Sequence, residues 1–166
     1  EGDGLSGGQG GWGGGGKRGG ACGAEEGQRG TVMGYEDRPQ ALAATCRFVW
    51  ERTATPIIVT ENGWAGSDDR RRAAFVQEAL SELHGAMAEG VDVRGYFYWS
   101  LLDNYEWAAG YGPKFGLIGV DRTNQQRRIK PSAVALGDIA RANALGAGAG
   151  PVEATKVMGG GAPVGL

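Results

Sequence analysis

Apolar residues in the middle of the chain occur in short runs and at helical spacing, and the two patterns alternate. Pro56 begins a continuous run through Val59, whose β-branched residues predict a strand buried on both faces. Before it, apolar residues recur every three to four positions from Pro39 to about Arg52. Because proline suits a first helical turn, this pattern predicts a helix over that range.

A second amphipathic pattern predicts a long helix between Ser67 and Gly90. Ser67 is a suitable N-cap and Gly90 a suitable C-cap. The run Arg70-Arg71-Arg72 at the helix start is interpreted as a solvated face, with anion binding as the alternative. His84 lies beside the apolar stripe and is expected on the helix surface. The stripe consists of Val76, Leu80, Leu83 and Met87.

The remaining elements follow in alternation. A second strand is expected over residues 93–99, then a long loop of aromatic and polar residues over 100–121. A last helix is expected to start at Pro131 and to carry Val134, Leu136 and Ile139. Strands separated by a helix of this length form a right-handed βαβ unit with a parallel pair. The sequence therefore predicts an α/β fold.

Composition divides the chain into three parts. Glycine makes up 33 of 166 residues and is concentrated in residues 1–30 and 146–166. Segments this rich in glycine bury too little apolar surface to offset the entropy of ordering, so both are expected to be disordered, or non-native in the case of 1–30. A glycine-rich RNA-binding tail is the alternative for 1–30, but Trp12 alone supplies little base stacking. Residues 31–145 form the structured part.

Charge and residue usage exclude several classes of function. The formal net charge is -2 and there is a single histidine, which argues against nucleic-acid partners and against a histidine-rich metal site. Cys22 and Cys46 predict neither a disulfide framework nor a zinc site. No run of about 18 apolar residues predicts a membrane span, and no secretion signal is evident, so a cytoplasmic location is expected.

Glu61 is the first candidate for chemistry. It follows the apolar run that ends at Val59, and Gly63 then permits a sharp turn. In parallel α/β folds, side chains at the carboxyl ends of strands converge on one mouth, which is where active sites form. A polar turn of Glu61, Asn62 and Gly63 without catalytic function is the alternative interpretation.

A second candidate site follows the second strand. Trp99 and Trp107 flank carboxylate and amide side chains in the sequence Trp-Ser-Leu-Leu-Asp-Asn-Tyr-Glu-Trp. Sugar rings present apolar C–H patches for stacking on indole and hydroxyl groups for hydrogen bonds to carboxylates. The alternative is that both tryptophans belong to the core and that the polar residues, including Glu106, cap a turn.

Together the two stretches resemble one family. Glu61-Asn62-Gly63, the segment from Trp99 to Trp107, and Lys114-Phe-Gly-Leu117 are similar to the last two strands of the family-one glycoside hydrolases, the β-glucosidase family. The resemblance extends from about Thr31 to about Leu145. It implies the C-terminal part of a (β/α)8 barrel, with strands seven and eight and their flanking helices, in an incomplete barrel.

The resemblance also implies roles for individual residues. Glu61 would be the nucleophile of a retaining β-glycosidase. Glu106 and Trp107 would hydrogen-bond hydroxyl groups of the sugar, Trp99 would stack beneath it, and Phe115 would line the pocket near its hydroxymethyl group. The expected partner is a β-glucoside or related sugar, and no metal or organic cofactor is expected. Lys114 leaves phosphorylated sugars open as substrates.

The sequence departs from a complete enzyme of this family in its length and in its acid/base residue. A barrel of this kind takes about 250 or more residues, and two parallel strands with their helices cannot close it. The family supplies its acid/base carboxyl group from an Asn-Glu-Pro motif, and none of the six prolines here follows a glutamate. We therefore expect the 166-residue chain alone to be poorly stable and catalytically silent. The alternative function is a non-catalytic carbohydrate-binding or regulatory fragment that uses the face from Trp99 to Trp107.

Overall fold

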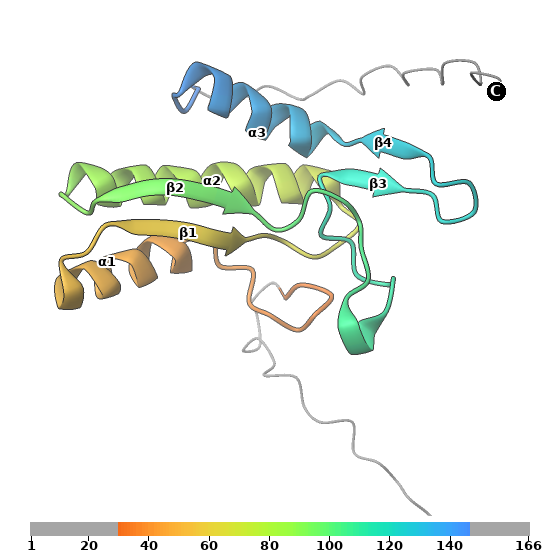
Figure 1. Ribbon diagram of the computed structural model, residues 1–166, viewed down its shortest axis with the longest axis horizontal. Coiled ribbons are helices and arrows are strands. Elements are labelled where there is room, and N and C mark those ends of the chain that lie inside the picture. Colours follow the sequence, from red (N-terminus) through yellow and green to blue (C-terminus); the bar gives the residue numbers. More distant parts are fainter. Residues whose placement is uncertain (1–29, 147–166) are drawn as a thin grey trace, which may run out of the picture.

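The computed structural model describes residues 30–146, so most of the glycine-rich end segments lie outside the described residues. Within this range the chain forms three α-helices, one short 3-10 helix and two pairs of strands (Figure 1). The helices are α1 (Ala41–Thr53), α2 (Asp69–Ala88), η1 (Trp107–Ala109) and α3 (Pro131–Ala142). The strands are β1 (Ile57–Asn62), β2 (Val93–Tyr98), β3 (Ile118–Val120) and β4 (Arg127–Ile129).

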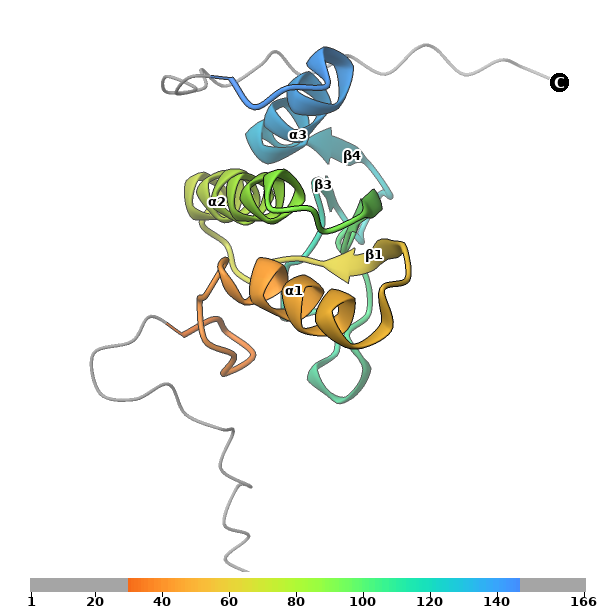
Figure 2. The same ribbon diagram turned by 90° about the vertical axis from the view of Figure 1, so that its left-hand side faces the viewer.

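The central unit is a right-handed βαβ arrangement, as the alternation predicts. β1 and β2 are parallel, and α1 and α2 lie on the same side of this sheet (Figure 2). Val59 of β1 is buried there with Cys46 of α1 and Leu83 of α2. α3 packs against α2 at the far end of the molecule from α1 (Figure 1).

The prediction that the first strand is buried on both faces is wrong. Val59 is 7% exposed, whereas its neighbour Ile58 is 58% exposed. Successive strand residues point to opposite faces, and the described helices cover only one of them. The strand also runs further than expected, so Glu61 and Asn62 are its last two residues.

The interpretation of Arg70, Arg71 and Arg72 as one solvated face is also wrong. Arg70 is exposed, but Arg71 pairs with Asp37 and Arg72 is 1% exposed. Consecutive helical residues are about 100° apart around the axis, so three in a row cannot share a face. The N-cap is Asp68 and not Ser67, because the Asp68 carboxylate accepts hydrogen bonds from the main-chain N–H groups of Arg70 (3.0 Å) and Arg71 (3.2 Å).

The rest of α2 agrees with the sequence pattern except at Met87 and at its end, where Glu89 and not Gly90 is the C-cap, and α3 begins at Pro131 as predicted. Val76 and Leu83 are buried, His84 is exposed, and Gly90 follows the helix with a φ of 101°. Met87, predicted in the buried stripe, is 45% exposed. Among the described residues, none of the helices has the length and apolar character needed to cross a bilayer.

The segment 100–121 is more structured than the predicted loop. It contains η1 and β3, and β3 pairs antiparallel with β4 just beyond it. The sequence shows no alternating pattern for these strands because each is only three residues long and all three residues of β4 are exposed. This hairpin connects the end of the sheet to Pro131, the first residue of α3.

Candidate active site

Glu61 lies on the side of the sheet opposite the helices. Val59 pairs with Tyr96 and Asn62 pairs with Tyr98, so three residues of β1 match two of β2. The Tyr96 hydroxyl donates a 3.0 Å hydrogen bond to Asn62 Oδ1, and Tyr96 packs with Val59 in the helix-side core. Val59 and Asn62 therefore share the helix side. This bulge leaves Glu61 exposed on the open side.

The turn after Glu61 is in direct contact with the end of β2. The main-chain N–H of Trp99 donates a 2.9 Å hydrogen bond to the carbonyl oxygen of Asn62. A Cβ atom added at Gly63 would lie 1.7 Å from the carbonyl oxygen of Trp99, so only glycine fits at this approach. The peptide bond from Trp99 to Ser100 is cis. The structure therefore brings the main chain of Trp99 to the strand end that holds Glu61.

Phe115 joins the same strand ends from a later loop. Its carbonyl oxygen accepts hydrogen bonds from the Tyr98 hydroxyl at 3.1 Å and from the Ser100 N–H at 3.4 Å. Phe115 is 8% exposed, so its side chain is packed among other residues and does not form an open surface. Its main chain thus adjoins the residues that flank Trp99.

The segment with η1 (Trp107–Ala109), whose N-cap is Glu106, forms a separate tip that protrudes beyond the carboxyl ends of β1 and β2 (Figure 1). The tip is closed by a 2.7 Å hydrogen bond from the Glu106 N–H to the Gly110 carbonyl and by an edge-to-face contact of Tyr105 with Tyr111. Trp107 is 81% exposed, so the alternative interpretation of this residue as core is wrong. The structure does not place this tip at the junction of Trp99 and Phe115.

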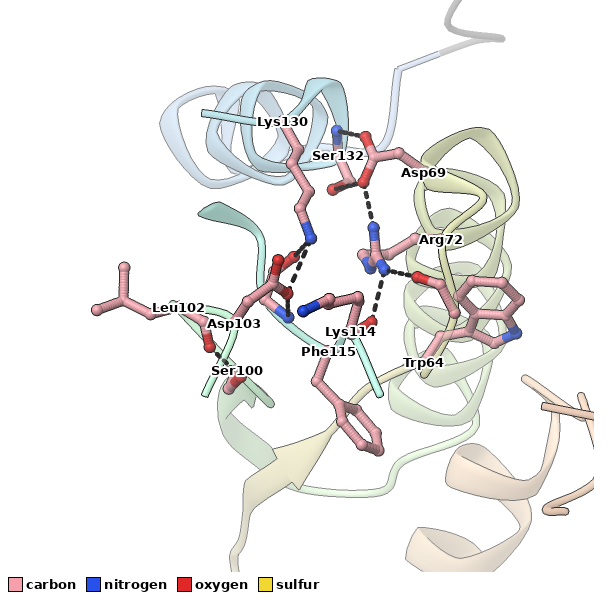
Figure 3. A network of polar contacts seen from close by, with 12 residues as sticks. Trp64, Asp69, Arg72, Ser100, Leu102, Asp103, Lys114, Phe115, Lys130 and Ser132 are labelled. Carbon is pink, nitrogen blue, oxygen red and sulfur yellow. Dashed lines mark hydrogen bonds and ion pairs between the residues drawn. The ribbon is translucent and has the colours of Figure 1, made fainter. Parts of the chain in front are cut away.

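A buried guanidinium group connects the loops behind the site (Figure 3). Arg72 donates a 2.7 Å hydrogen bond to the Lys114 carbonyl, and it also bonds to the Gly66 carbonyl and the Asp69 carboxylate. Asp69 in turn accepts hydrogen bonds from the Ser132 N–H (2.9 Å) and hydroxyl (2.7 Å) at the start of α3. One side chain therefore joins the segment after β1, the Phe115 loop and α3.

A second buried pair fixes the start of the long loop (Figure 3). Asp103, which is 7% exposed, accepts hydrogen bonds from the Lys130 ammonium group at 3.0 Å and the Gly116 N–H at 2.9 Å. Burial lowers the pKa of Lys130, and the hydrogen bond to Asp103 opposes that change. Lys114, considered above as a cation for phosphorylated sugars, instead directs its ammonium group to the Tyr111 carbonyl at 2.8 Å.

These two buried networks were not predicted from the sequence. A signal for Arg72 was present, since Asp69 and Arg72 are three positions apart on a helix and one of three consecutive arginines must face inward. No comparable signal marked Asp103, whose partners are distant in sequence. Within residues 30–146 there is no group of three or more histidine, cysteine, aspartate or glutamate residues that could hold a metal ion.

Comparison with known proteins assigns the family. The family model described as Glycosyl hydrolase family 1 matches residues 19–145. The chain belongs to this family. The chain is 39% identical to a beta-galactosidase of Sulfolobus acidocaldarius over 113 residues, which are 68% of this chain and 23% of that protein.

Two solved family 1 structures superpose on this chain. The apo structure of a beta-glucosidase matches with a TM-score of 0.69 and 53% identity, over 70% of this chain and 29% of the other. The beta-glucosidase from Thermotoga maritima in complex with deoxynojirimycin matches with a TM-score of 0.70 and 33% identity, over 74% and 30%. These neighbours are TIM barrels, which confirms the predicted fold class, and the described residues form a part of such a barrel that is not closed. The chain spans less than a third of each of these relatives.

Proposed function

We propose that this chain supplies the nucleophile side of a retaining β-glycosidase of family 1, and that Glu61 is the nucleophile. The observation that supports this most is the placement of Glu61 at the carboxyl end of β1, exposed on the side of the sheet away from the helices. In a TIM barrel, the side of the sheet away from the helices faces the barrel interior. Active sites of such barrels lie at the carboxyl ends of the strands.

In the proposed reaction the Glu61 carboxylate attacks the anomeric carbon of the sugar. The bond to the leaving-group oxygen breaks, and a glycosyl ester on Glu61 forms. A second carboxyl group protonates the leaving oxygen and later takes a proton from water, which attacks the ester and restores the carboxylate. Two inversions give net retention of configuration. The two carboxyl groups perform the chemistry, so no metal or organic cofactor is needed.

The second carboxyl group is proposed to come from a part of the barrel outside this chain. Retaining enzymes need it at about 5 to 5.5 Å from the nucleophile. The chain has no Asn-Glu-Pro motif that would supply it. For this reason we propose that the 166-residue chain on its own does not turn over glycosides.

Trp99, Glu106, Trp107 and Phe115 are proposed to bind the sugar. The names of the relatives support a pyranose substrate, since they include a beta-glucosidase with deoxynojirimycin bound and a beta-galactosidase. Trp99 adjoins the turn after Glu61 and is suited to stacking. The Glu106 carboxylate would accept hydrogen bonds from hydroxyl groups of the sugar, and the Trp107 indole N–H would donate one. For this, either the two residues move inward or the sugar binds at the protruding tip.

A non-catalytic sugar-binding role is the second candidate. The high exposure of Trp107, 81%, favours it, because an exposed indole beside a carboxylate is a suitable sugar platform without any reaction. Under this proposal Glu61 would be dispensable, and replacement of Trp107 would remove binding.

A chimaeric barrel tests the two candidates. In it, residues 31–145 replace the matching segment of the Thermotoga maritima beta-glucosidase, which supplies the remaining strands. If Glu61 is the nucleophile, the chimaeric barrel hydrolyses an aryl β-glucoside, and Glu61→Gln lowers kcat by roughly a thousandfold or more. Glu51→Gln, an exposed change on α1, is the matched control and leaves kcat unchanged. Equal kcat values for Glu61→Gln and the control would refute the proposal.

A further inference from the structure

The bulge at the end of β1 decides to which side of the sheet Glu61 points. Two residues of β1 lie between Val59 and Asn62, where the paired segment of β2 has one. A regular strand would direct Glu61 to the same side as Val59, among the helices. Because of the extra residue, Glu61 is exposed on the open side and Asn62 lies on the helix side.

A bulge disrupts the hydrogen bonds between the strands, so other contacts must favour it. The Tyr96 hydroxyl donates a 3.0 Å hydrogen bond to Oδ1 of Asn62, the residue next to Glu61. This bond requires the Asn62 side chain to lie on the helix side. In a regular strand Asn62 would point to the open side, and the hydroxyl would lose this acceptor. The hydrogen bond therefore favours the bulged arrangement over the regular one.

The donor of this hydrogen bond is itself fixed by packing. The Tyr96 ring is half-buried against the helix-side core, which includes Val59 and Leu83. Burial raises the pKa of the Tyr96 hydroxyl, so this group keeps its proton at neutral pH and stays a donor. A donor on a packed ring has few alternative positions, and it therefore restrains Asn62 more closely than an exposed side chain would.

Tyr98 contacts the same turn further along the chain. It lies on the same side of β2 as Tyr96, two residues away, and its hydroxyl accepts a 3.4 Å hydrogen bond from the Trp64 N–H. Trp64 is separated from Glu61 by the turn, whereas Asn62 follows Glu61 directly. Of the two hydroxyl groups, that of Tyr96 therefore bears more directly on the direction of the carboxylate.

We propose that Tyr96 is a positioning residue for the nucleophile, because its hydrogen bond to Asn62 maintains the bulge that directs Glu61 toward the sugar. This inference rests on the proposed function, in which Glu61 attacks the anomeric carbon. The attack needs a carboxylate oxygen close to that carbon and opposite the leaving oxygen. A displacement of about 1 Å lowers the rate of attack by up to roughly a hundredfold, while contacts that bind the rest of the sugar remain.

The test uses Tyr96→Phe in the chimaeric barrel, since phenylalanine keeps the ring in the core and removes only the hydroxyl group. A 2-deoxy-2-fluoro-β-glucoside with a good leaving group isolates the attack, because leaving-group release reports formation of the ester. The rate of release per site is expected to fall roughly tenfold or more. The reagent concentration that half-saturates this rate stays within about twofold, since slow chemistry makes it a dissociation constant.

The total amount of leaving group released separates positioning from folding. It counts the competent sites and is expected to stay at about one per barrel in Tyr96→Phe. A merely structural role for Tyr96 would lower this number at an unchanged rate per site. Tyr35→Phe is the matched control, because Tyr35 is 60% exposed and remote from the Asn62 side chain's hydrogen bond, and it leaves both rate and number unchanged.

Asn62→Ala tests whether Tyr96 acts through this acceptor. It removes Oδ1 and is expected to lower the rate of ester formation, and Tyr96→Phe then has little further effect in the double variant. Losses that multiply in the double variant would show that the two residues act independently, which would overturn the inference.

The outcomes distinguish this inference from the proposed function. An unchanged rate per site in Tyr96→Phe, with the fluorosugar found on Glu61, would overturn the inference and leave the proposed function in place. The fluorosugar on another carboxylate would refute the proposed function, and this inference with it.

Discussion

The buried guanidinium group of Arg72 donates a 2.7 Å hydrogen bond to the carbonyl oxygen of Lys114, which is 42 positions away in the sequence. The same side chain bonds to Gly66, close after the Glu61 turn. A residue on α2 therefore bridges the loop that contains Phe115 and the loop that follows Glu61, which are also joined directly by a 3.1 Å hydrogen bond from the Gly66 N–H to the Lys114 carbonyl. This arrangement makes Arg72 a determinant of stability and of site geometry.

Replacement of Arg72 by methionine is expected to destabilise the chimaeric barrel by about 3–5 kcal/mol. The change removes the cation that pairs with the Asp69 carboxylate and the Arg72 donor of the Gly66 carbonyl, and breaking a buried ion pair typically costs that much. Urea unfolding followed by tryptophan fluorescence measures the loss. Arg70→Met, at an exposed position two residues earlier, should change the free energy of unfolding by less than about 0.5 kcal/mol. Similar losses for the two variants would contradict the assignment.

Gly63→Ala is expected to destabilise the chimaeric barrel by about 1–3 kcal/mol and to lower its activity. The added methyl group would lie 1.7 Å from the Trp99 carbonyl oxygen, so the ends of β1 and β2 must separate. Gly85→Ala is the control, because its new Cβ has no neighbour closer than 4.0 Å and alanine favours the helix interior. A thermal melt should show opposite shifts for the two variants, and a neutral Gly63→Ala would refute the close approach.

Stability is expected to fall at alkaline pH in a way that depends on Tyr96. Burial raises the pKa of the Tyr96 hydroxyl above the usual tyrosine value of about 10. The folded state therefore keeps a proton that the unfolded chain releases, and the free energy of unfolding decreases as the pH rises above about 10. Tyr96→Phe removes the hydrogen bond to Asn62, which costs about 1 kcal/mol near pH 8, but makes the alkaline decrease shallower. The measurement is urea unfolding at several pH values in this range. If the account is wrong, the free energy of unfolding decreases with pH as steeply in Tyr96→Phe as it does without the substitution.

The purified 166-residue chain is expected to show no hydrolysis of an aryl β-glucoside above the background of buffer. It has no Asn-Glu-Pro motif to supply the proposed acid/base carboxyl group, and within residues 30–146 β1 and β2 form a sheet of two strands. Colorimetric assay of the chain alone, beside the chimaeric barrel at the same concentration, is the measurement. Robust turnover by the chain alone would show that the chain supplies both carboxyl groups itself.

The elements that sequence patterns predicted best are those with a continuous apolar signal. α2, with its stripe through Val76 and Leu83, and the strand that begins after Pro56 both lie where the pattern indicates. The two-sided burial of that strand was wrong because Ile58 depends on a partner surface that is not within residues 30–146. Periodicity within one strand reports that a face is apolar, and not whether anything covers it.

The position of Glu61 at a strand end followed from the sequence, but its side of the sheet did not. Strict alternation would place Glu61 on the same side as Val59, among the helices. The bulge between Val59 and Asn62 reverses this, and nothing in the local sequence predicts an extra residue there. The buried roles of Arg72 and Asp103 were missed for a related reason, because their partners Lys114 and Lys130 are distant along the chain.

The central claim, that Glu61 forms a covalent glycosyl ester, is tested most directly by trapping that ester in the chimaeric barrel. A 2-deoxy-2-fluoro-β-glucoside with a good leaving group slows both steps, and release of the ester more than its formation, so the intermediate accumulates. Peptide mass spectrometry should then find the fluorosugar on the peptide that contains Glu61, with no label in Glu61→Gln. A label on another carboxylate, or rapid inactivation of Glu61→Gln, would contradict the claim.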